Sequence, residues 1–185
     1  MKDTATAPTS PATGFAAPTS PVSGFASPSS PATGFASPAT GFTERAADYS
    51  IYKPNSRGNG GVLRFSLNAN KAAIFVEAAA QSGDKQFDWD HKITMKWGLS
   101  DVGCVLATLQ GRQPQAKLFH QTDKANSAFE LTLRDDPERA PYAMSISRQE
   151  TSDKSLRKVS IPITHAEAAV LETALRVAVS CLIGW

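Results

Sequence analysis

Residues 159–167 of this 185-residue chain read Val-Ser-Ile-Pro-Ile-Thr-His-Ala-Glu, a junction between a strand and a helix. Large aliphatic side chains occupy every second position over residues 159–163, which is the period of a half-buried strand. Thr164 and Glu167 then have the spacing of a Thr-x-x-Glu capping box, which satisfies free N–H groups at the start of a helix. We therefore predict a strand that leads directly into a last helix over about residues 166–182.

The same order, a strand followed by a helix, occurs once before in the chain. Residues 92–97 alternate between lysine or threonine and a large apolar side chain, which indicates a strand. Apolar residues then recur at helical spacing up to Leu109. We expect Ser100 to be the N-cap of this helix and Gly111 to end it.

Further strands are predicted on both sides of the first helix. Residues 72–80 are rich in alanine and could form a strand or a helix, but the polar residues that flank them favour a strand. Two rounds of four strands and one helix predict an α+β fold, with antiparallel sheets and the helices on one side. The other predicted strands cover residues 49–53, 61–68, 117–122, 128–134 and 142–148.

The first quarter of the chain differs from the rest in composition. Residues 4–43 contain no charged side chain, and a motif of Pro, Ser, Thr and Ala returns four times, each time ending in Gly-Phe. Such repeats bury too little apolar surface to offset the entropy of ordering, so we predict a disordered tail over residues 1–45 and a folded domain over residues 46–185. The tail is either a flexible leader or a row of Gly-Phe groups that make weak multivalent contacts with a protein partner or with unwound bases.

Composition and motifs exclude several classes of protein. The apolar runs are too short for a membrane span, and the first residues resemble neither a secretory signal nor an organelle presequence, so we expect a cytoplasmic protein. The three histidines lie far apart, and the motifs of phosphate-binding loops and serine hydrolases are missing from the sequence. We expect no enzyme activity, no metal and no cofactor. We interpret Asp88 and Asp90 as a polar rim, and Cys104 and Cys181 as buried, reduced cysteines.

Basic and aromatic residues are interleaved on the strands and loops of the first half of the domain. Exposed rings stack on bases at roughly 1–3 kcal/mol per base, and neighbouring lysines and arginines pair with phosphates, so such a sheet suits a single-stranded nucleic acid. Periodicity does not tell which rings are exposed, but Phe65 and Trp97 share faces with aliphatic residues and are expected in the core. The set comprises Tyr49, Tyr52, Lys53, Arg57, Arg64, Phe65, Phe87, Trp89, Lys92, Lys96 and Trp97.

Five spaced motifs carry a resemblance to a known family. They are Tyr49-Ser-Ile-Tyr-Lys53, Phe87-Asp-Trp-Asp90, Leu99-Ser-Asp-Val-Gly103, Leu118-Phe-His120, and the stretch from Val159 to Glu167 with the helix that follows it. In this order and at these separations, over about residues 47–185, the chain resembles the Whirly family of single-stranded DNA-binding proteins of plants. It departs from the family at Val62, which stands where the second lysine of a Lys-Gly-Lys motif would fall.

The resemblance implies a fold, an assembly and a ligand. The fold would be two packed antiparallel four-stranded sheets, each followed by a helix, and four protomers would assemble through their helices. Single strands would run along the sheets between neighbouring protomers with little sequence preference. Residues of the core or of the helix interface would be Leu106, Leu109, Val170, Leu171, Leu175 and Val179.

We therefore predict a single-stranded DNA-binding protein of low sequence specificity that acts in genome maintenance, recombination or regulation of DNA-templated transcription. Because the formal net charge is only +2, we expect a shallow salt dependence, with stacking supplying much of the affinity. Two alternatives remain: an RNA-binding or RNA-annealing protein, since kinetoplastid guide-RNA-binding proteins share this fold, or an oligomeric hub that displays the Gly-Phe repeats. We expect a bacterial-type cytoplasm or nucleoid rather than a plant organelle or nucleus. The predicted phosphate contacts are Lys53, Arg64, Lys92 and Lys96, and the predicted stacking residues are Tyr52, Phe87 and Trp89.

Overall fold

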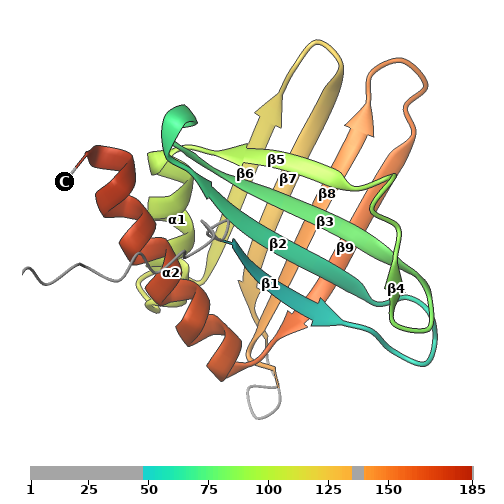
Figure 1. The fold of residues 1–185 in the computed structure, drawn as a ribbon, viewed down its shortest axis with the longest axis horizontal. Coiled ribbons are helices and arrows are strands. Elements are labelled where there is room, and N and C mark those ends of the chain that lie inside the picture. Colours follow the sequence, from blue (N-terminus) through green and yellow to red (C-terminus); the bar gives the residue numbers. More distant parts are fainter. Residues whose placement is uncertain (1–47, 135–139, 185) are drawn as a thin grey trace, which may run out of the picture. The chain divides into compact units, whose positions relative to one another are not determined.

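The computed structural model describes residues 48–134 and 140–184, which form two antiparallel sheets and two helices (Figure 1). The two sheets lie face to face with their strands crossing, and the helices lie side by side at one end of the sheets. The predicted α+β fold, with two packed antiparallel sheets that each lead into a helix, is confirmed. The predicted disordered tail, residues 1–45, lies outside the described residues.

The first sheet is built from the first half of the domain. A 3-10 turn, η1 (Ala69–Lys71), connects its second strand to its third, so the alanine-rich run is a strand as expected. One short strand, β4 (Gln86–Phe87), pairs with the end of the third strand and was not predicted, because two residues show no period. The four main strands are, in spatial order, β1 (Asp48–Lys53), β2 (Gly61–Asn68), β3 (Ala73–Gly83) and β5 (Ile93–Trp97).

The second sheet has the spatial order β6-β7-β8-β9, in which every strand pairs with its neighbour in the sequence. All four predicted strands are present, but each extends beyond its predicted end on at least one side. The added residues are mostly polar or exposed, and backbone pairing does not require an apolar side chain. The strands are β6 (Gln115–Gln121), β7 (Ala125–Leu133), β8 (Tyr142–Glu150) and β9 (Leu156–Ile163).

The two helices, α1 (Leu99–Leu109) and α2 (His165–Ile183), follow β5 and β9 directly. The capping box of α2 is confirmed, since the Thr164 N–H donates to Glu167 Oε2 at 2.9 Å and the Glu167 N–H donates to Thr164 Oγ1 at 3.3 Å. The predicted N-cap of α1, Ser100, is wrong. The N-cap is Gly98, two residues earlier, and the Gly98 N–H donates to the Asp101 carboxylate at 2.9 Å. An acidic residue in the first turn serves this helix end without a capping hydroxyl.

The core between the sheets is centred on Trp97. Its side chain has no exposed surface, and its ring centroid lies 4.7 Å from that of Phe129 in the second sheet and 5.8 Å from that of Phe65 in the first. Both predicted core aromatics are thus confirmed. The sheets approach closely at Gly61, where a Cβ atom would lie 2.5 Å from Val159 Cγ1, so this position on β2 requires glycine.

The helices bury only part of the apolar face expected of them. Leu109, Leu171 and Leu175 are buried, and Leu106 and Val179 pack against the core from partly buried positions. Val170, by contrast, is 51% exposed. The prediction that both cysteines are buried is wrong, since Cys104 is partly buried and Cys181 is exposed. Cys181 is exposed because it lies on the face of α2 that points away from the sheets. Neither helix of the described ranges is long and apolar enough to cross a membrane.

Candidate nucleic-acid interface

One face of the first sheet packs against the second sheet, and we call the opposite one its outer face. Successive side chains of a strand alternate between the two faces. Leu63 and Phe65 on β2 belong to the core cluster, so Arg64 between them lies on the outer face. Its cross-strand partner Glu77 on β3 lies beside it, and Thr94 on β5 follows in the same row. The outer face therefore carries charged and polar residues in register.

Aromatic rings gather at one end of the outer face. β4 and the turn that follows it bring Phe87 and Trp89 to the sheet. The ring of Phe87 lies 5.6 Å from that of Tyr52 on β1, measured between centroids. The Arg64 guanidinium lies 4.7 Å from the ring centroid of Trp89, which is a cation–π contact. Tyr52 is 54% exposed, and this end of the face therefore offers rings to a ligand beside a positive charge.

A single carboxylate, Glu77, holds two of the predicted phosphate-binding side chains. Arg64 donates to it through Nε at 2.9 Å and also through Nη2, and Lys92 Nζ lies 2.6 Å from Glu77 Oε1. Burial alone would raise the pKa of Glu77, but hydrogen bonds and charges from Lys92 and Arg64 outweigh burial and lower it. Glu77 is therefore ionised at neutral pH and occupies the same cations that a phosphate would bind.

The other end of the outer face carries a second pairing of a ring and a cation. Lys71 Nζ lies 5.3 Å from the ring centroid of Phe75, and exposed Lys96 is the cross-strand neighbour of Phe75 on β5. Sequence reasoning missed Phe75, Lys71 and Glu77, because the surrounding alanines hid the alternation of β3. The signal was the period of two itself, since Ile74 and Val76 lie in the core.

Lys53 lies apart from the other predicted site residues. Tyr52 precedes it on β1, so the two side chains point to opposite faces. Lys53 Nζ lies 2.6 Å from Glu167 Oε1 at the start of α2. Burial alone would raise the pKa of Glu167, but hydrogen bonds from Lys53 and Thr164 and the Lys53 charge lower it. The structure thus brings six of the seven predicted site residues to the outer face and places Lys53 on the other side.

Asp88, one of the two carboxylates that flank Trp89, serves the turn. Asp88 accepts a hydrogen bond from the His91 backbone N–H at 3.2 Å, and its Oδ2 lies 2.9 Å from His91 Nδ1. These hydrogen bonds from His91 lower the pKa of the Asp88 carboxyl. Among the residues that the structure describes, no group of three or more His, Cys, Asp or Glu side chains is arranged to hold a metal ion.

Comparison with known protein families and solved structures assigns the chain to a family. The sequence model of the family described as Whirly transcription factor matches residues 60–174, more than half of the chain. The chain belongs to the Whirly family. Its Whirly relatives include the chloroplastic single-stranded DNA-binding protein WHY1 of Solanum tuberosum, 23% identical over 63% of this chain and 44% of that protein. Another is the mitochondrial single-stranded DNA-binding protein WHY2 of Arabidopsis thaliana, 25% identical over 68% of this chain and 52% of that protein. The chain spans about half the length of these Whirly relatives.

Solved structures share the Whirly fold. The crystal structure of WHY1 from Arabidopsis thaliana matches with a TM-score of 0.61 at 21% identity, over 75% of this chain and 85% of that one. A guide-RNA-binding protein complex bound to a guide RNA matches with a TM-score of 0.56 at 16% identity, over 77% of this chain and 96% of that one. The family resemblance that the five motifs predicted is confirmed.

Proposed function

We propose that this Whirly protein binds single-stranded DNA with low sequence specificity, through the outer face of its first sheet. Its role would be in genome maintenance, recombination or the regulation of DNA-templated transcription. The observation that carries the proposal is the contact of Arg64 with Trp89 beside the pair formed by exposed Tyr52 and partly buried Phe87. Rings and cations of this kind recognise base faces and phosphates, which every nucleotide has, and so give affinity with little sequence preference.

The names of the Whirly relatives support the choice of ligand. The proteins from Solanum tuberosum and Arabidopsis thaliana that match this chain are named single-stranded DNA-binding proteins. Duplex DNA is a poorer fit to the same face, because its base faces are stacked inside the helix and are closed to aromatic side chains. A ligand with unpaired bases can use both kinds of group on the outer face.

Fluorescence polarisation of labelled oligonucleotides tests the proposal. The full chain is titrated into single-stranded DNA, the matching duplex and single-stranded RNA of the same sequence, each at two salt concentrations. We expect tighter binding to the single strand than to the duplex, and a shallow decrease of affinity with salt. Equal or tighter binding to the duplex would contradict the proposal.

RNA is the second candidate ligand, because a guide-RNA-binding complex shares the fold. Stacking and phosphate contacts do not distinguish the two nucleic acids, whereas a donor or acceptor for the 2′-hydroxyl would. The RNA arm of the same titration decides between them. Tighter binding to RNA than to DNA at both salt concentrations would make RNA the ligand.

We infer that the protein is a homo-oligomer, in the form of a tetramer joined through its helices. The support is an apolar groove of about 620 Å³ between α2 and the nearby ends of β1, β2 and β3. Val170 and Val177 stand two turns apart on the same face of α2 and are 51% and 62% exposed. Sedimentation of the full chain and of Val177→Asp tests this. A tetramer that the substitution dissociates is expected, and a wild-type monomer would contradict it.

The role of the Gly-Phe repeats remains a proposal, since they lie outside the described residues. Four tails on one tetramer would add weak contacts with a protein partner or with unwound bases. Deletion of residues 1–43 tests this by its effect on affinity, cooperativity and assembly. If all three values are unchanged, the tail is only a flexible leader. If the tail captures a protein partner and the folded domain does not bind single strands, the protein is an oligomeric hub that displays the repeats. A bacterial-type cytoplasm or nucleoid also stays a prediction.

A further inference from the structure

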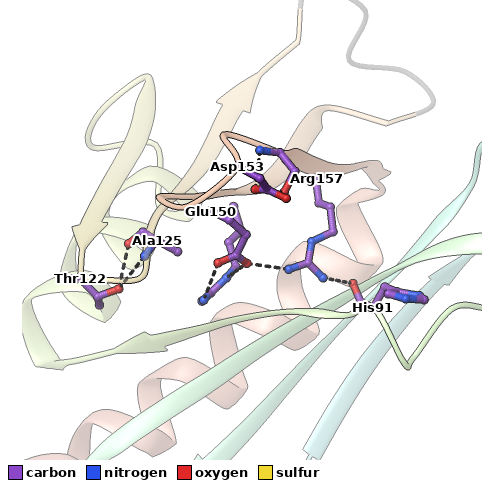
Figure 2. Close-up of polar contacts among 8 residues, drawn as sticks. His91, Thr122, Ala125, Glu150, Asp153 and Arg157 are labelled. Carbon is purple, nitrogen blue, oxygen red and sulfur yellow. Dashed lines mark hydrogen bonds and ion pairs between the residues drawn. The ribbon is translucent and has the colours of Figure 1, made fainter.

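One side chain of the second sheet reaches across to the turn that carries Trp89. Arg157 lies on β9, and its Nη1 donates a hydrogen bond to the backbone carbonyl of His91 at 3.0 Å. His91 belongs to the connection between β4 and β5 of the first sheet. Figure 2 shows the Arg157 side chain extended between Glu150 and His91, with a contact at each end of its guanidinium. The contact therefore joins the two sheets away from their hydrophobic core.

The guanidinium of Arg157 is also held by a second contact, on the side away from His91. Its Nη2 donates to Glu150 Oε1 at 2.8 Å, and Arg148 Nε donates to the same oxygen at 2.8 Å. The hydrogen bonds from Arg148 and Arg157, together with their charges, lower the pKa of the Glu150 carboxyl. Asp153 lies nearby in Figure 2, but its carboxylate accepts hydrogen bonds from the Ser155 N–H and hydroxyl, at 2.9 and 2.7 Å. Glu150 is thus the group that orients Arg157.

The contact with His91 fixes one end of an exposed turn. At the other end, the Asp88 N–H donates to the Ala80 carbonyl on β3 at 2.9 Å. Between these two points the turn makes hydrogen bonds of its own, such as that from the Lys92 N–H to the Trp89 carbonyl at 3.4 Å, and the Trp89 ring contacts Arg64. Trp89 lies between the two fixed ends. The hydrogen bond from Arg157 is therefore one of the contacts that hold the turn from which Trp89 projects.

We propose that Arg157, oriented by Glu150, is a positioning residue of the nucleic-acid interface: it fixes the turn that presents Trp89 on the outer face of the first sheet. This inference rests on the proposed function. Arg157 acts through the turn and not by contact with the strand. Lysine at this position keeps the charge but lacks the planar fork that donates to Glu150 and His91 at once.

The test compares Arg157→Lys, Arg157→Ala and Glu150→Gln with the wild-type full chain. Arg112 is a charge-matched control, since it is exposed and belongs to the turn after α1. Fluorescence polarisation with a labelled oligo-dT at several salt concentrations gives affinity and salt slope. Hydrogen exchange of the free protein reports on residues 86–93, and thermal unfolding shows that each variant is folded.

We expect both Arg157 variants to bind oligo-dT about tenfold more weakly, with an unchanged salt slope and faster exchange in residues 86–93. Glu150→Gln should likewise weaken binding and speed exchange in residues 86–93. A variant that also carries Trp89→Ala should bind no more weakly than Trp89→Ala alone, because Arg157 acts through that ring. Arg112→Lys and Arg112→Ala should leave exchange in the turn unchanged.

Three results would overturn the inference. One is wild-type affinity in both Arg157 variants, and another is unchanged exchange in residues 86–93. The third is a loss confined to Arg157→Ala with a salt slope smaller by about 0.7, which is the signature of a direct phosphate contact on a single strand. Failure of the wild-type chain to bind oligo-dT would instead overturn the proposed function, and the role of Arg157 at the interface with it.

Discussion

The two sheets share strand order and alternation, yet their outer faces differ in how rings and charges are arranged. On the first sheet, Arg64 contacts both Glu77 and Trp89. On the second, the corresponding cross-strand ion pair joins Lys117 and Glu130 at 3.4 Å, with side chains 63% and 42% exposed. The side chains of Arg64 and Glu77 are only 33% and 14% exposed. The first pair is therefore less screened by water than the second.

Aromatic side chains show the same contrast. Phe119 on β6 is 64% exposed, and within the described ranges no contact of its ring with another ring or a cation is found. Its cross-strand neighbour is Ala128, and Ser147 follows in the same row. On the first sheet, β4 and the turn after it add the rings of Phe87 and Trp89 to that of Tyr52 on β1. The comparison teaches that the turn, more than the strands, makes one face suited to stacking.

Trp89→Ala should cause the largest loss of affinity for single-stranded DNA. One stacked base contributes roughly 1–3 kcal/mol, so we expect binding weaker by about 5-fold to 150-fold in fluorescence polarisation. Phe119→Ala is the matched variant on the second sheet and should change affinity by less than about twofold. A larger loss from Phe119→Ala than from Trp89→Ala would reverse the comparison.

Glu77→Gln should increase affinity severalfold, because it frees Arg64 and Lys92 for phosphate. The slope of log affinity against log salt should become steeper by about 0.7 for each cation that gains a phosphate contact on a single strand. Glu130→Gln, the matched change on the second sheet, should leave affinity and slope nearly unchanged. Weaker binding by Glu77→Gln would instead show that Glu77 supports the ligand by orienting Arg64.

Lys96→Gln should reduce affinity by about twofold to fivefold and decrease the salt slope by about 0.7, as expected for loss of one phosphate contact. Lys53→Gln should change binding less and lower the stability of the fold, since Lys53 pairs with Glu167 on the other side of the sheet. Polarisation and urea unfolding of both variants separate the two effects. Loss of affinity in Lys53→Gln alone would place the strand on the opposite side.

Acid should weaken the fold through Glu77 and Glu167, whose pKa values are both lowered. A lowered pKa stabilises the folded state at pH values above the ordinary glutamate pKa of about 4.3, and this contribution is lost as the pH falls through the lowered value. After solvent screening we expect about 0.5–1 kcal/mol for each group. Urea unfolding at neutral and acid pH measures this. The dependence should be flatter in Glu77→Gln than in Glu130→Gln, and equal dependence would contradict it.

Much of the fold could be predicted from local pattern. The capping box at Thr164 marks the start of α2, and the alternation of residues 61–68 gives β2 with its observed bounds. The start of α1 could not be predicted as reliably, because Asp101 caps it from within the helix. Alternation even separates Tyr52 from Lys53, since neighbouring residues of a strand point to opposite faces.

The residue types of the candidate site could be predicted from the sequence, but the contacts between its side chains could not. Tyr52, Phe87, Trp89 and Arg64 could be identified as a basic and aromatic set before their contacts were known. The roles of Glu77 and Arg157 depend on which strands and turns meet, and Arg157 lies 66 residues from His91 in the sequence. No local periodicity reports such a contact, because it arises only when the two sheets pack.

Photocrosslinking tests the central claim most directly. An oligonucleotide that contains 5-bromodeoxyuridine is bound to the full chain and irradiated, and the linked peptides are identified by mass spectrometry. The account predicts that crosslinks concentrate in residues 49–53 and 86–92, which carry Tyr52, Phe87 and Trp89. Crosslinks confined to residues 115–121, around Phe119 on the second sheet, would contradict it.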